Sequence, residues 1–109
     1  MKVDFLKAKI LIVDDEQANI ALLEDVLDSE GYSLFKSTVD SRKALDLYKE
    51  FGPDLVLLDL NMPHLDGFQV MEQLKEVEEN SYAPILVLTA QSDRNSRLRA
   101  LAAGARDYI

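Results

Sequence analysis

The sequence predicts an α/β domain with a doubly wound parallel sheet that is covered by helices on both faces. Two observations favour this class. Short, wholly apolar runs stop abruptly at acidic or hydroxyl side chains, as strands buried on both faces do. Between them lie segments whose apolar residues recur at helical spacing, and an alternation of strands and helices is typical of parallel sheets.

The first strand and helix are predicted near the N-terminus. Ile10–Val13 is an apolar, β-branched run that ends at Asp14 and Asp15. From Gln17 onward the apolar spacing becomes helical, and Gly31 follows the segment as a C-terminal glycine should. The expected inward-facing positions of this helix are Ile20, Leu23, Val26 and Leu27.

The same unit then recurs. Residues 33–39 predict a second strand and residues 41–51 a second helix, after which Leu55–Leu58 forms another fully apolar strand that ends on Asp59. In the second helix, the residues expected to face inward are Ala44, Leu45 and Tyr48. Carboxylates therefore follow two different buried strands.

The C-terminal half completes the pattern after a loop over residues 61–67. The elements expected there are a helix with Phe68, Val70, Met71, Leu74 and Val77 inward, a strand over 84–88 that ends on Thr89, a short helix over 94–103, and the start of a fifth strand at 107–109. The whole chain, residues 1–109, is expected to fold as one domain.

Polar side chains at the ends of three strands predict a binding site. In a doubly wound sheet, ligands bind outside the carboxyl ends of the strands, where Asp14, Asp15, Asp59 and Thr89 are expected to meet. Three carboxylates repel one another unless a cation lies between them. Oxygen ligands with open positions suit Mg²⁺ together with a phosphate group, and Mn²⁺ would fit similarly.

An Asp carboxylate can also act as a nucleophile toward phosphorus. Asp59 is the candidate because it is a single carboxylate at the end of the middle strand of the predicted sheet. Thr89 could donate a hydrogen bond to a phosphoryl oxygen. The alternative for any single Asp after a strand is a turn or a helix N-cap, which is what we expect of Asp66 and Asp93. His64 lacks a second His or a Cys at ligand spacing and is expected to be an ordinary loop residue.

Composition excludes several classes of function. The formal charge of −8 opposes binding to nucleic acid or to an anionic membrane surface. The chain has no cysteine, which excludes disulfides and thiolate chemistry. No apolar run approaches the roughly 18 residues that a membrane span requires, and the expected location is the cytoplasm.

The motifs taken together closely resemble the receiver domain of bacterial two-component response regulators. They are Ile12–Glu16, Asp54–Pro63, Asp66–Gly67, Leu88–Ala90 and Gly104–Ile109. The resemblance implies a flavodoxin-like fold with strand order 2-1-3-4-5. It also implies Mg²⁺-dependent phosphoryl transfer to Asp59 from a phosphohistidine of a sensor histidine kinase or phosphotransfer protein, and a signal relayed to an output domain.

The resemblance also implies roles for individual residues. Asp15 and Asp59 would bind Mg²⁺ directly, the backbone carbonyl of Asn61 would be a third ligand, and Asp14 would act mostly through a water. Thr89 would contact the phosphoryl group. Tyr108 would change rotamer as Thr89 moves, so that the chain acts as a switch that catalyses only its own phosphorylation and dephosphorylation.

One departure from the family leaves alternatives open. Receivers of this type carry a lysine two residues beyond Ile109 and then a fifth helix, so we expect a shortened receiver or part of a longer regulator; a complete protein of this length would favour dimerisation. One alternative is a receiver-like interaction module that is not efficiently phosphorylated. Another is a phosphatase with an Asp nucleophile, but such enzymes have a second Asp where this chain has Asn61.

Overall fold

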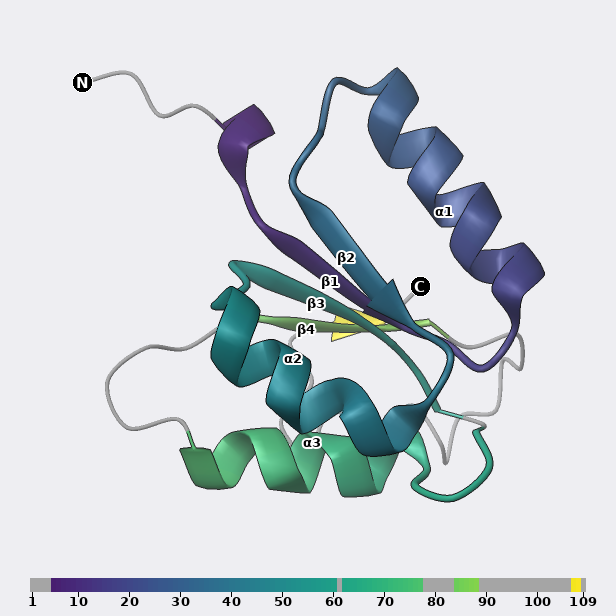
Figure 1. The fold of residues 1–109 in the computed structure, drawn as a ribbon, viewed down its shortest axis with the longest axis vertical. Coiled ribbons are helices and arrows are strands. Elements are labelled where there is room, and N and C mark those ends of the chain that lie inside the picture. The colour runs from purple at the N-terminus through teal and green to yellow at the C-terminus, as the bar shows by residue number, and fades with distance from the viewer. Residues whose placement is uncertain (1–4, 61, 78–83, 89–106, 109) are drawn as a thin grey trace.

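Five parallel strands form a single sheet in the order β2-β1-β3-β4-β5. The computed structural model describes residues 5–60, 62–77, 84–88 and 107–108 (Figure 1). The strands are β1 (Ile10–Val13), β2 (Phe35–Thr38), β3 (Leu55–Asp59), β4 (Ile85–Leu88) and β5 (Asp107–Tyr108). The predicted fold class and the strand order implied by the resemblance are confirmed.

Helices cover both faces of this sheet. They are α1 (Gln17–Ser29), α2 (Ala44–Phe51) and α3 (Gly67–Val77), with short 3-10 turns at Phe5–Lys7 and Ser41–Lys43. Figure 1 shows α1 on one face, and α2 and α3 together on the other. None of the helices in the described ranges has the length and apolarity needed to cross a membrane. The helix predicted over 94–103 lies outside the described residues.

The central strand β1 shows how the chain divides its apolar side chains between two cores. Because successive side chains of a strand point to opposite faces, Leu11 and Val13 pack with α2 and α3, whereas Ile10 and Ile12 pack toward α1. All four are nearly inaccessible to water. Burying one such side chain contributes roughly 1.5–3 kcal/mol to folding, so the two cores fix β1 firmly at the centre of the sheet.

Three sequence-based expectations need correction. The second strand is shorter than the predicted 33–39, and residues 41–51 form a 3-10 turn followed by α2 rather than one helix. Val26 is 50% exposed and not inward-facing. At about 100° per residue, Ile20, Leu23 and Leu27 define an apolar stripe, and Val26 lies about 90° from its centre.

Candidate functional site

Three carboxylates meet at the carboxyl edge of the sheet. Asp14 and Asp15 follow β1, and Asp59 is the last residue of β3, the neighbouring strand, in which Leu58 is in register with Val13. One oxygen from each carboxylate lies within 4.8 Å of the others. The structure thus brings together three of the four polar groups expected at this edge. Thr89 follows β4 in the sequence and lies outside the described residues.

Asp14 is held by its own segment of chain. It is only 3% exposed, and its carboxylate accepts hydrogen bonds from the Glu16 N–H (Oδ1, 2.9 Å) and from the Asn19 side-chain amide (Oδ2, 3.4 Å). A buried carboxylate needs such donors because burial removes its hydration. Asp14 therefore acts both as the turn former considered as an alternative and as a member of the acidic cluster. Asn19 was not among the residues predicted for this site, although the sequence places its amide side chain in the first turn of a predicted helix.

The chain after Asp59 returns tightly to the end of β3. The Gly67 N–H donates to the Leu60 carbonyl at 3.0 Å. A Cβ at position 67 would lie 2.6 Å from the Asp59 carbonyl oxygen and 2.7 Å from the Leu60 Cα, so no side chain fits there. Gly67 thus allows the start of α3 to pack directly against the backbone of the proposed phosphoacceptor.

Asp66 is the N-cap of α3, as the sequence predicts. Its Oδ1 accepts from the Gln69 N–H at 2.9 Å, and the Gln69 side-chain oxygen accepts from the Asp66 N–H at 2.9 Å. These reciprocal bonds form a capping box, which satisfies two backbone donors that a helix start otherwise leaves unpaired. His64, in the same loop, is exposed and does not belong to the acidic cluster.

The donor set of the cluster fits a small, hard cation. Oxygen atoms bound to one octahedral Mg²⁺ at about 2.1 Å lie roughly 3 to 4.2 Å apart, which a group spread over no more than 4.8 Å can approach with small side-chain movements. Asp15 and Asp59 are half-buried, so an incoming group can reach them. Asn61 lies outside the described residues, and the side chain of Tyr108 is likewise not described.

In a doubly wound sheet, ligands bind outside the carboxyl ends of the strands at the switch point in strand order, which is where the three carboxylates lie. The model of the response regulator receiver domain matches residues 10–109, and the chain belongs to this family. The match confirms the resemblance noted in the sequence motifs.

Individual relatives agree with the family match. The chain is 42% identical to the response regulator MprA of Mycolicibacterium vanbaalenii over 95% of its own length and 44% of MprA. It is 32% identical to the chemotaxis protein CheY of Thermotoga maritima, over 93% of this chain and 82% of CheY. The chain thus spans less than half of MprA but most of CheY.

A solved structure with a similar fold is a complex whose name includes BeF₃ and Mg²⁺. A chain of the CheX–CheY–BeF₃–Mg²⁺ complex from Borrelia burgdorferi superposes with a TM-score of 0.85 at 28% identity, covering 94% of this chain and 76% of that one. The similarity extends over nearly the whole chain.

Proposed function

We propose that this chain is a signalling switch in which Asp59 accepts a phosphoryl group. Membership of the receiver family supports phosphorylation-dependent signalling in general. The observation that carries the specific proposal is the cluster of Asp14, Asp15 and Asp59, in which one oxygen from each carboxylate lies within 4.8 Å of the others at the ligand-binding edge of the sheet.

The proposed reaction is a transfer from a phosphohistidine of a sensor histidine kinase or phosphotransfer protein. An Asp59 carboxylate oxygen attacks the phosphorus atom, and a P–O bond forms as the P–N bond to the imidazole breaks. The imidazole nitrogen keeps the electron pair and takes up a proton. The product is an aspartyl phosphate, and its hydrolysis resets the switch.

The residues present could hold Mg²⁺, and Mn²⁺ by the same chemistry. Asp15 and Asp59 would bind the ion directly, with the backbone carbonyl of Asn61, while Asp14 would act through a water. When bound, the ion neutralises charge on the carboxylates and on the phosphoryl oxygens. The Mg²⁺ and BeF₃ named for the Borrelia complex support this proposal.

The proposed output depends on Thr89 and Tyr108. Thr89 would contact the phosphoryl group, and Tyr108 would change rotamer with it, which would carry the signal to the surface around the helix predicted over 94–103 and the fifth strand. The greater length of MprA supports an output region in a longer regulator. With a charge of −8, we expect protein partners in the cytoplasm rather than nucleic acid or a membrane.

The test is labelling by a small phosphodonor such as acetyl phosphate with Mg²⁺. Intact-protein mass should show one added phosphoryl group on the wild-type chain and none on Asp59→Asn. Asp25→Asn, the same substitution at an exposed position of α1, is the matched control and should label normally. Labelling that persists in Asp59→Asn would refute the role of Asp59. An unlabelled wild-type chain would favour the interaction module, and turnover of a phosphomonoester would favour the phosphatase.

A further inference from the structure

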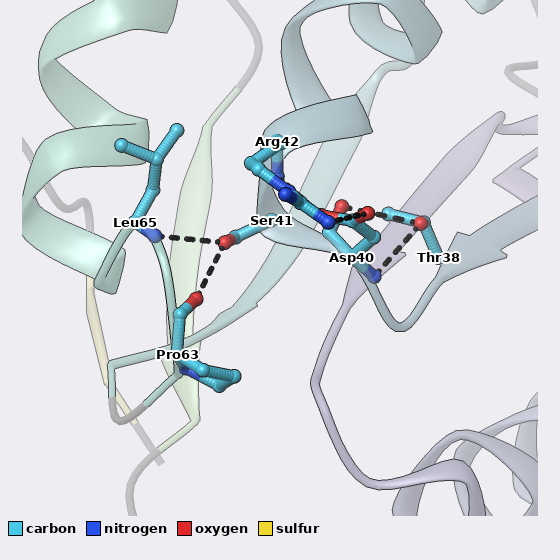
Figure 2. Close-up of polar contacts among 6 residues, drawn as sticks. All are labelled: Thr38, Asp40, Ser41, Arg42, Pro63 and Leu65. Atoms are coloured by element: carbon cyan, nitrogen blue, oxygen red, sulfur yellow. Dashed lines mark hydrogen bonds and ion pairs between the residues drawn. The ribbon is translucent and has the colours of Figure 1, made fainter.

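Ser41 is a buried hydroxyl that links two parts of the chain far apart in sequence. It is 1% exposed and lies in the 3-10 turn before α2. Its Oγ donates to the Pro63 carbonyl at 3.0 Å and accepts from the Leu65 N–H at 3.1 Å (Figure 2). Both partners belong to the loop that follows Asp59, which is therefore tied to the start of α2.

The two hydrogen bonds fall on either side of His64. His64 has φ 70°, and among the described residues it is the non-glycine residue with a left-handed backbone. L-residues rarely adopt this conformation, and it persists where the surroundings enforce it. Ser41 holds the carbonyl before His64 and the N–H after it, so one hydroxyl fixes the backbone on both sides of the strained residue.

This loop runs between two other fixed points. At its start it leaves Asp59 and Leu60 at the end of β3, and at its end Gly67 donates back to the Leu60 carbonyl. The capping box of Asp66 and Gln69 then fixes the first turn of α3. Ser41 constrains the section between these points, over residues 63–65.

The position of Ser41 is itself fixed by its neighbours. Asp40 is the N-cap of the turn, and its carboxylate accepts from the Arg42 N–H and side chain at 3.0 Å. The Asp40 N–H donates to the Thr38 hydroxyl at the end of β2 (Figure 2). The turn that contains Ser41 is therefore held by hydrogen bonds on both sides, which fixes the position of the Ser41 hydroxyl relative to the loop.

We infer that Ser41 is a positioning residue for the acidic site: its hydroxyl holds the loop after Asp59 in the conformation that binds Mg²⁺. The inference rests on the proposed function, since it concerns the same site. Ser41 contacts neither the cluster nor the transferred group, so it should influence how tightly the metal binds rather than the chemical step.

The experiment titrates Mg²⁺ alone into the wild-type chain, Ser41→Ala and Ser29→Ala, followed by amide NMR shifts under conditions where all are folded. Ser29 is the control, because its hydroxyl donates locally to the Val26 carbonyl on the exposed side of α1. Ser41→Ala should raise the Kd for Mg²⁺ about tenfold and speed exchange of the Leu65 amide. Ser29→Ala should change neither.

Two further variants separate positioning from general stability. In Ser41→Ala/His64→Gly, glycine adopts a positive φ without strain, and at least half of the lost affinity on a logarithmic scale should return. Ser41→Cys keeps a side chain of the same shape and only slightly larger size with a weaker hydrogen-bonding group, and it should also raise the Kd, even if Ser41→Ala does not fold. At saturating Mg²⁺, the rate at which acetyl phosphate labels the Ser41 variants should stay within about twofold of the wild-type rate.

The outcomes are distinguishable. An unchanged Kd for Mg²⁺ in both Ser41 variants, with a wild-type chain that binds Mg²⁺ and is labelled, would overturn the inference and leave the proposed function standing. A double variant that binds no better than Ser41→Ala would also contradict the positioning role. A wild-type chain that shows no response to Mg²⁺ would overturn the proposed function and the inference with it.

Discussion

The two loops that form the acidic site are held in different ways. After β1, the carboxylate of Asp14 is bound by groups only two and five residues further along the chain. After β3, the loop is bound by Ser41, whose partners are 22 and 24 residues away. The Asp14 carboxylate is therefore fixed by its local sequence, whereas residues 63–65 of the second loop require a partner from the distant turn before α2.

The largest effect is expected at the β3 loop, from Gly67→Ala. The added Cβ would meet backbone atoms at 2.6 and 2.7 Å, which cannot move aside as a side chain end can. We expect a loss of about 3 kcal/mol in the free energy of unfolding, measured by urea titration. Gly52→Ala is the control: its φ is 60°, but nothing lies within 4 Å of the added Cβ, so the loss should be about 1 kcal/mol. Equal losses would show that close packing against Asp59 is not the reason for Gly67.

A smaller effect is expected from Asp66→Ala, which removes the capping box of α3. The free energy of unfolding should fall by about 1 kcal/mol, since the Gln69 N–H loses its side-chain acceptor. Urea titration measures this loss, and Asp66→Asn, which keeps a capping oxygen, should recover most of it. If Asp66→Asn were as unstable as Asp66→Ala, the cap would not explain the loss.

At the β1 loop, Asp14→Asn should change stability with opposite signs in the absence and presence of metal. Without Mg²⁺, removing one of three like charges should stabilise the fold by roughly 0.5–1 kcal/mol. Saturating Mg²⁺ should stabilise the wild-type chain more than the variant, because the free energy by which a ligand stabilises the folded state increases with the logarithm of its affinity. Thermal unfolding without Mg²⁺ measures the first change in stability, and thermal unfolding with Mg²⁺ measures how much the metal stabilises each chain. A variant that gains as much from Mg²⁺ as the wild type would exclude Asp14 from the metal site.

The smallest effect concerns the turn that presents Ser41. The hydrogen bonds from Arg42 hold the pKa of Asp40 at about 2, below its ordinary value of 3.8. Because the folded pKa is lowered, the ionised carboxylate stabilises the fold above pH 3.8, and this contribution is lost as the pH falls through about 2. A ¹³C NMR titration of the Asp40 carboxyl should show this midpoint, and Arg42→Ala should move it toward 3.8. An unmoved midpoint would exclude the Arg42 side chain as the cause.

The features that the sequence could predict are those that depend on residues close together in the chain. Apolar runs that end in Asp14, Asp15 and Asp59 carry their own signal, so the strands and the meeting of the three carboxylates follow from pattern and from the geometry of parallel sheets. The capping box of Asp66 is also local and was predictable as an N-cap.

The features that sequence reasoning missed depend on distant partners or small angular offsets. Ser41 looks like an ordinary residue at the start of a helix, and nothing in its neighbours shows that its partners are the backbone of Pro63 and Leu65. Val26 fits a loose helical spacing, yet its direction differs enough from Ile20 to leave it half exposed. Such details require the packed structure.

The position of β1 within the sheet has a consequence for the order of folding. β1 pairs with β2, where Ile10 meets Phe35, and with β3, where Ile10 meets Leu55, 45 positions along the chain. Pairings between distant residues slow folding because a long loop must close first. During synthesis the first two strands and two helices, up to α2, cannot complete the sheet around β1, so we expect the core to condense only after Leu55–Asp59 has left the ribosome.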